Sequence, residues 1–450
     1  MGMIPLNYRR PSFVEKTTMG DSQSSLEDGD GGERSLRSAK SGNLSGIPEA
    51  LSFEKIIDGG TCPPCTLREF MNYLVYIERS AENLQFYLWF RTYVTRFKLA
   101  KTMDISLAME WTQAMEDEAI ARIQKEHAEK ARKAPKAGTA AEIFAGSDFV
   151  KGSEVPSVAT AEIANPFGTP PATPSEFNQP SDYSNSPEDD SYRMKANKAF
   201  ASAGVKAPFT IQPFRKEVDR VVATYIMDGA PRQLNLSDRE QKAVLHALAF
   251  TTHPSAFGIL IQATESTLRR QAHPNFIRWS ICNGNPARVS FARALGASLI
   301  LAGFAVAVVL TLSGAPRGYR ALAAVGWVLG ISTLIAAWKG MCVVLHGMHH
   351  RHVRPWELFI HELEDAEADR IKQRSFDSFG SANSYEEQPW VIRYQRRNIV
   401  RKVFDREVHI REPALRQIQD VIFLQSVLCA VVLSAVLTVI FVLVPGADMF

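Results

Sequence analysis

Two groups of side chains in this chain of 450 residues have the types and spacing that redox or metal chemistry needs. Cys62 and Cys65 are separated by two residues, the spacing of redox-active dithiols. Because no strand precedes them and no second cysteine pair follows, redox or zinc chemistry is the weaker interpretation. Four histidines follow a long apolar run: His346, His349, His350 and His352. No cysteine or carboxylate shares their turn, so a polar helix end is favoured over a metal site, and we expect no cofactor and no catalytic residue.

A different chemistry, recognition of a protein surface, is indicated by a polar block within an apolar helical pattern. The segment 67–90 contains Phe70, Tyr73-Leu74, Ser80, Glu82-Asn83-Leu84 and Phe86. This block resembles the signature of regulator of G-protein signalling (RGS) domains, which reads roughly as Phe-x-x-Phe/Tyr-Leu followed a few residues later by Ser-x-Glu-Asn-Leu-x-Phe. Further landmarks of that family are resembled by Tyr225-Ile226, Leu234-Asn235-Leu236, Phe257 and Asn275-Phe276-Ile277. The resemblance implies a helical bundle formed by residues 49–103 and 205–285.

RGS domains supply no acid, base or nucleophile, because Gα subunits carry their own catalytic Arg and Gln. They bind the switch segments of Gα and hold them in the transition-state geometry. The resemblance therefore implies that Glu82, Asn83 and Gln271 lie at a Gα interface. Two departures from the family accompany it: the predicted helix from Asp238 lacks a second interfacial Asn, and Gln271 stands where an acidic residue is expected. Each lost polar contact costs about 1–3 kcal/mol, which implies weaker Gα binding or a different partner.

Three uncharged apolar runs near the C-terminus predict membrane-spanning helices. Uncharged residues run from 294 to 312, from 321 to 338 and from 421 to 444, and the second apolar run extends past Lys339, so that the second predicted helix covers 321–345. At a rise of 1.5 Å per residue, each run can cross a hydrocarbon layer of about 30 Å. One such run could be a buried helix of a soluble protein, but three of this purity could not, because soluble helices keep a polar face.

The distribution of Lys and Arg around these runs predicts the orientation. Residues before the first run and residues 346–420 are rich in Lys and Arg, whereas the first loop has only Arg317 and Arg320 and the tail has none. The positive-inside rule then places the N-terminus in the cytosol and the C-terminus outside or in a lumen. No signal peptide precedes them, since residues 1–10 lack an apolar core. The expected location is the plasma membrane or an endomembrane.

The remaining chain is divided by composition. Residues 1–48 read as a disordered tail, 104–134 as a charged helix, 135–204 as a Pro-rich disordered insert, and 346–420 as a cytosolic helical and basic segment. The predicted fold class is all-α: an RGS-like bundle split by a disordered insert and followed by three transmembrane helices. This layout is similar to a fungal family of RGS-domain membrane proteins that includes landmarks of cell polarity.

A cluster of basic residues next to the third run predicts contact with anionic lipid headgroups. Residues 393–416 hold eight basic and three acidic residues. The predicted lipid contacts are Arg393, Arg396, Arg397, Arg401 and Lys402. A plain positive-inside loop is the overlapping alternative. The net charge of +3 argues against nucleic acid as a partner.

Two functions remain open at this level. The first is a membrane-tethered regulator that binds a Gα subunit and, at most, activates its GTPase. The second is a non-catalytic landmark or scaffold whose RGS-like domain only binds partners, a second membrane protein among them. A transporter is disfavoured because the three runs contain no acidic pair and no inverted repeat.

Overall fold

The structure, a computed structural model, describes residues 47–100, 105–133, 187–313, 315–360, 369–370, 373, 376–383 and 389–445. The predicted tail up to residue 46 and residues 134–186 of the predicted insert lie outside these ranges. The chain divides into two compact units. Unit 1 comprises residues 1–96, 231–234 and 260–450, and unit 2 comprises 97–230 and 235–259. Both units are built almost wholly of helices, so the all-α prediction is confirmed.

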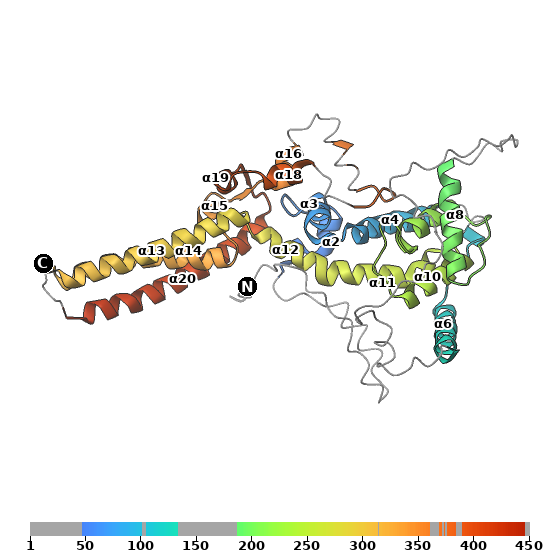
Figure 1. The fold of residues 1–450 in the computed structure, drawn as a ribbon, viewed down its shortest axis with the longest axis horizontal. Coiled ribbons are helices and arrows are strands. Elements are labelled where there is room, and N and C mark those ends of the chain that lie inside the picture. The colour runs from blue at the N-terminus through green and yellow to red at the C-terminus, as the bar shows by residue number, and fades with distance from the viewer. Residues whose placement is uncertain are drawn as a thin grey trace, which may run out of the picture. The chain divides into compact units, whose positions relative to one another are not determined.

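Part of unit 1 is a small helical bundle (Figure 1). Its core is rich in aromatic side chains. The bundle contains α2 (Phe53–Ile57), α3 (Leu67–Tyr73), α4 (Ala81–Leu99) as far as Arg96, α11 (Gly258–Thr267) from Leu260, and α12 (His273–Ile281). Wider π-helical turns, Leu74–Glu78 and Leu268–Ala272, extend α3 and connect α11 to α12. Phe70 and Tyr73 of α3 pack on Phe276 of α12, with ring centroids 5.0 and 5.5 Å apart. Segments about 200 residues apart in sequence therefore share one core.

Three helices of unit 1 are long and apolar enough to cross a membrane, as predicted. They are α13 (Pro286–Leu312), the turn Arg317–Leu322 continued by α14 (Ala323–Trp338), and α20 (Pro413–Leu443). Both α13 and α20 pack against α14 (Figure 1). The side chain of Asn285 accepts a hydrogen bond from the Arg288 N–H at 2.8 Å, which caps the start of α13.

The prediction that the second span continues to Leu345 is wrong, because α14 ends at Trp338. The N–H groups of Met341 and Gly340 donate back to the carbonyls of Ala336 and Ala337, the pattern of a Schellman motif. Gly340 has φ +81°, and a Cβ there would lie 2.6 Å from the sulfur of Cys282. Glycine is thus required at this turn, and the apolar sequence beyond it forms a separate helix, α15 (Val343–Gly347).

The segment between the second and third spans is more mixed than the predicted helical segment. It contains α15, β1 (His350–His352), α16 (Pro355–Ile360), α18 (Pro389–Gln395), α19 (Ile399–Val403) and β2 (Glu407–His409). Strands β1 and β2 pair antiparallel, with Arg351 opposite Val408. This pairing was not expected because each strand has only three residues, too few for an alternating pattern to be recognised.

Unit 2 is a second helical assembly, made of α6 (Gln113–Lys133), α8 (Pro187–Ser202), α9 (Arg215–Val221) with the π-helical turn Val222–Ile226, and α10 (Asp238–Phe250). Ser237 caps α10 in a reciprocal capping box with Glu240, so the helix predicted from Asp238 begins there. The charged helix that was expected from residue 104 begins at Gln113.

The predicted disorder of residues 187–202 is wrong, because they form α8. Its apolar residues Ala196, Ala199, Phe200 and Ala203 are buried and recur at i, i+3, i+4 and i+7. Three of these four side chains are those of alanine, so their helical spacing is weak as a hydrophobic signal. Packing of α8 on α9, as the contacts within unit 2 show, supplies the stabilisation that the local sequence lacks.

Candidate functional site

The predicted partner-binding residues lie where the π-helical turn Leu74–Glu78 leads into α4. Asn83 is half-buried in the first turn of α4, and its side-chain amide donates to the carbonyl of Ser80 at 3.4 Å. Glu82 is also half-buried. The residue before Ser80, Arg79, has φ +58°, which redirects the chain between the two helices.

Gln271, in the turn Leu268–Ala272 between α11 and α12, contacts the same junction. Its side-chain amide donates to a carboxylate oxygen of Glu78 at 3.5 Å. Burial raises the pKa of Glu78, while hydrogen bonds from Tyr73, Asn275 and Gln271 act in the opposite direction. The structure thus brings Gln271 to the turn that precedes Asn83, although 188 residues separate them in sequence.

A segment of the same chain, residues 376–383, lies against the start of α4 and is called the docked segment below. Gln85 and Asn383 exchange two amide hydrogen bonds, each of 3.1 Å. The ring of Phe379 contacts Trp89 edge-on, with centroids 6.3 Å apart. The face of α4 that carries Glu82, Gln85 and Trp89, at i, i+3 and i+7, is therefore occupied within the chain.

Arg232 secures the docked segment. Its guanidinium is buried and donates to the carbonyls of Ser381, at 3.0 Å, and of Asp377. Asn383 also bonds to Glu82, and Arg232 acts on the same carboxyl through its charge. Sequence analysis missed this contact because it joins three segments that lie far apart in the chain.

The Glu82 carboxyl titrates near neutrality in this environment. Burial raises its pKa to about 7, and the hydrogen bond from Asn383 and the charge of Arg232 only partly offset that rise. A raised carboxyl pKa contributes stability that is present below the unfolded-state value and lost as the pH rises through 7.

Glu82→Gln is therefore expected to increase stability more at pH 8 than at pH 5, because at pH 5 the folded-state carboxyl is still protonated. The gain should be roughly 1–2 kcal/mol, less than the full shift because the carboxyl keeps some contact with water. Thermal unfolding of the purified full chain in detergent at both pH values measures it. Glu49→Gln, at an exposed position of unit 1, is the control. An equal gain from Glu82→Gln at pH 5 and pH 8 would contradict the assignment.

The five predicted lipid-contact residues fall into two groups. Arg393, Arg396 and Arg401 are exposed. Arg397 instead forms a double hydrogen bond with Asp405, at 3.1 and 3.0 Å. Lys402 donates to the carbonyl of Gln395 at 3.2 Å and lies over the ring of Tyr394. Three of the five charges thus face solvent, and two stabilise the α18–α19 segment itself.

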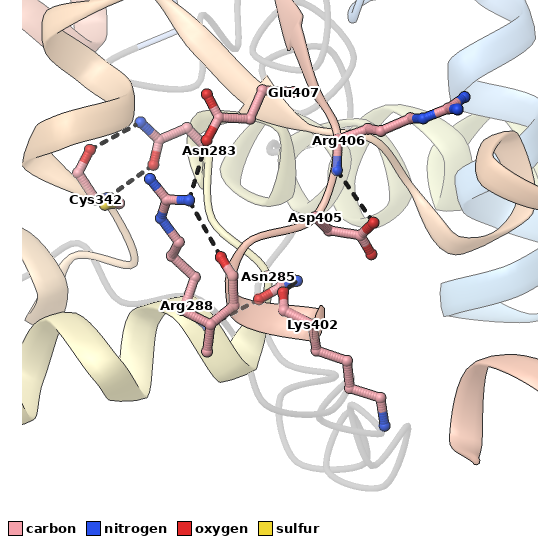
Figure 2. Close-up of polar contacts among 9 residues, drawn as sticks. Asn283, Asn285, Arg288, Cys342, Lys402, Asp405, Arg406 and Glu407 are labelled. Atoms are coloured by element: carbon pink, nitrogen blue, oxygen red, sulfur yellow. Dashed lines mark hydrogen bonds and ion pairs between the residues drawn. The ribbon is translucent and has the colours of Figure 1, made fainter. Parts of the chain in front are cut away.

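The α18–α19 segment is joined to the start of α13. Figure 2 shows Arg288 reaching from α13 to Glu407, with a nitrogen–oxygen distance of 3.0 Å. Arg288 also donates to the carbonyl of Val403 at 3.1 Å, and the side chain of Asn285 donates to the carbonyl of Lys402. These bonds fix α19 beside the first turns of the first span.

A second connection ties the end of the second span to the α12–α13 linker. Asn283 accepts from the N–H of Cys342 at 2.8 Å and donates to the Cys342 carbonyl at 3.2 Å (Figure 2). The carbonyl of Asn283 accepts the N–H of His352 at 2.9 Å. One asparagine therefore satisfies backbone groups of two segments that would otherwise be buried without partners.

An ion-pair network joins the region between the spans to the bundle. Arg351 is buried and makes two hydrogen bonds to the Glu357 carboxylate, at 2.9 and 2.8 Å. Burial and then the charge of Glu357 raise the pKa of Glu69, on α3, to about 7. Burial also raises the pKa of Glu357, but the ion pair with Arg351 outweighs it and holds this pKa below the usual value. Two carboxyl groups thus share the Arg351 guanidinium, and the charge of Arg354 acts on both of them as well.

Aromatic stacking surrounds that network. The Arg354 guanidinium lies 3.6 Å from the ring centre of Trp279 on α12, a cation–π contact. Trp356 stacks on Trp279 and on Tyr76, with centroids 5.9 and 4.9 Å apart. The bundle and the membrane-proximal segment consequently share one packed core within unit 1.

The cysteines and histidines singled out in the sequence lie in different environments. Cys62 is exposed, whereas Cys65 is buried and its burial raises the pKa of the thiol far above the usual range, which disfavours a reactive thiolate. His346 packs on Phe423 of α20 and approaches Asp420 at 3.5 Å. Burial and the charge of Arg288 lower the pKa of His352 to about 4. Within the described ranges, no group of three or more His, Cys, Asp and Glu side chains is arranged to hold a metal ion.

Comparison with protein-family models, curated proteins and solved structures finds no match to this chain.

Proposed function

We propose that this protein is a membrane-tethered regulator of G-protein signalling that binds a Gα subunit through the start of α4. The observation that carries the proposal is the position of Asn83 and Gln271. Both lie at the junction between Leu74–Glu78 and α4, where the resemblance assigns a Gα interface. This junction belongs to the same unit as the three membrane-spanning helices, which would hold it near a membrane-bound Gα.

The chemistry of such a regulator is pre-organisation. Polar groups such as the Asn83 amide would bind the switch segments of Gα in the geometry of GTP hydrolysis and lower the barrier without donating a catalytic group. The effect on hydrolysis should be small. The side chain of Gln271 already binds Glu78, and α10 provides no asparagine to replace the missing interfacial one.

The alternative, a non-catalytic landmark or scaffold in cell polarity of a fungal cell, is favoured by the docked segment. Glu82 and Gln85 are engaged by Asn383, so a Gα could reach them only after residues 376–383 had left α4. A second membrane protein is the partner that this alternative predicts. Both functions require the same anchoring.

The proposed orientation keeps the bundle in the cytosol and the end of α20 outside or in a lumen, at the plasma membrane or an endomembrane. The contacts of Arg320 support this orientation. This residue lies in the turn Arg317–Leu322 at the start of the second span, where it is buried and donates to the carbonyls of Phe441 and Val444, at 2.9 and 2.6 Å. Its charge caps the C-terminal end of α20, so it is held by the protein and not by a cytosolic headgroup layer.

Asn83→Ala tests the proposed interface. We expect the purified full chain to bind Gα loaded with a transition-state mimic about 5- to 100-fold more weakly after this change, because one polar interfacial contact is worth about 1–3 kcal/mol. The measurement is affinity for Gα in the GDP, GTP-analogue and mimic states. Thr95→Ala, at an exposed position of the same helix, is the matched control.

Two results would contradict the regulator. Binding that is equal in all three nucleotide states, in the unaltered chain, would support the scaffold. A lower unfolding temperature for Asn83→Ala with unchanged affinity per folded molecule would show that Asn83 only packs the start of α4.

A further inference from the structure

The α18–α19 segment exposes large apolar side chains between its exposed arginines. Ile399 is 70% exposed, Val400 60% and Phe404 67%, and Ile392 is exposed to half of its surface. Single exposed apolar residues are common on soluble proteins and need no explanation. Four within 13 residues of one short segment form an apolar surface whose exposure to water is unfavourable.

The position of this surface relative to the first span is fixed by the contacts of Figure 2. The carbonyls of Lys402 and Val403 bind Asn285 and Arg288 at the start of α13. The ring of Phe404 packs edge-on against Phe291, one further turn along α13, with centroids 6.0 Å apart. The apolar face of α19 is therefore continuous with the side of α13.

The length of α13 determines the depth in a bilayer at which α19 contacts it. Its 27 residues span about 40 Å at 1.5 Å per residue, which exceeds a hydrocarbon layer of about 30 Å. The uncharged run begins at Ala294, so the preceding turns, from Pro286 to Arg293, lie at the level of the headgroups. Helix α19, bound to those turns, lies at the same level.

The charges around the apolar face match a lipid surface. Arg393, Arg396 and Arg401 are exposed, while Arg397 and Lys402 are used inside the segment. Apolar side chains combined with exposed cations are the pattern of elements that lie in the interface of an anionic membrane.

We propose that α18 and α19 form an interfacial membrane anchor. Ile399, Val400 and Phe404 insert at the boundary between headgroups and acyl chains, and Arg393, Arg396 and Arg401 contact anionic headgroups. The anchor does not depend on Gα binding. The proposed anchor depends on the span α13 and on the contacts that hold α19 against it. Compared with the lipid contacts predicted from the sequence, it omits Arg397 and Lys402 and adds the apolar residues Ile399, Val400 and Phe404.

The test uses nitroxide spin labels on the full chain reconstituted in vesicles. Labels are placed through Ile399→Cys or Val400→Cys in a chain that also carries Cys62→Ser and Cys429→Ser. The other three native cysteines are buried. Oxygen, which partitions into lipid, should relax both labels more strongly than a water-soluble nickel complex does. Lys55→Cys, at an exposed position of α2, is the control and should show the reverse order.

A change in the lipid composition of the vesicles tests whether the three exposed arginines contact anionic headgroups. The ratio of oxygen to nickel accessibility at residue 400 should be higher in vesicles with phosphatidylserine than in pure phosphatidylcholine. The combined change Arg393→Gln, Arg396→Gln and Arg401→Gln should abolish that difference. A difference that survives the triple change would refute the role of these arginines.

Two outcomes at residues 399 and 400 would overturn the anchor itself. Nickel accessibility equal to that at residue 55 would place the segment in water. Shielding from both reagents would show that protein covers it, from a second copy or another partner. Unchanged thermal unfolding of each labelled chain confirms that the fold is intact.

Discussion

Replacing Arg351 by alanine is expected to destabilise unit 1 by about 3 kcal/mol, the lower end of the cost of breaking a buried ion pair. The change removes the cation that two carboxyl groups share. Glu357 loses both of its hydrogen bonds to the guanidinium, and Glu69 loses the larger of the two positive charges, those of Arg351 and Arg354, that oppose its own desolvation. The loss should appear in thermal or denaturant unfolding of the full chain in detergent at pH 7.5.

The pH dependence distinguishes this cause from simple loss of packing. Without Arg351, the carboxyl groups of Glu69 and Glu357 can become neutral by binding protons, so the destabilisation should be smaller at pH 5 than at pH 7.5. For the same reason, Glu357→Gln in the Arg351→Ala chain should restore part of the stability. Arg91→Ala is the matched control, because the pair of Arg91 with Asp58 is exposed (side chains 48% and 60%) and its loss should cost less than about 1 kcal/mol. Equal losses at the two arginines would refute the shared network.

Replacing Gly330 by leucine is expected to separate α13 from α14 at a cost of about 3 kcal/mol, the upper end of typical overpacking costs. A Cβ at Gly330 would lie 2.6 Å from Cγ1 of Ile300 and 2.8 Å from the carbonyl oxygen of Gly296. The second obstacle is backbone, which cannot rotate away. Gly326 and Gly330 are four residues apart, the small-xxx-small spacing that allows membrane helices to approach closely.

The measurement is the unfolding temperature of the detergent-solubilised chain. Gly318→Leu is the control, because no atom lies within 4 Å of a Cβ built there, in the turn that leads into α14. Equal unfolding temperatures for the two variants would mean that α13 and α14 are not closely packed in the protein. A further close approach, at Gly303, is made by the ring of Trp327, which also packs on Phe441 of α20. The close packing of the three helices therefore depends on glycine at specific positions along them and not on general hydrophobicity.

The sequence alone determined the features that depend on local composition and short spacing. Apolar runs with no charge predicted three spans, and α13 and α20 contain the first and third of them. The capping box at Ser237 is a feature of this local kind, because its two partners are three residues apart. The helical class followed from periodicity, which each segment shows by itself. Asn83 and Glu82 were recognised as a block because they are adjacent.

Only the tertiary structure decided where these elements end and what they bind. The apolar run through Val343 to Leu345 gives no reason to stop at Trp338, but Asn283 binds the backbone of Cys342 and the crowded Cys282 requires Gly340. Likewise, no local pattern connects Gln85 to Asn383, or Arg351 to Glu69, because hydrophobicity and spacing describe neighbours along the chain. Buried polar groups must find partners wherever folding brings them together, so these contacts depend on the whole arrangement. For the same reason, the sequence does not distinguish Arg397 from Arg401. Only the fold places Asp405 beside Arg397 and leaves Arg401 exposed.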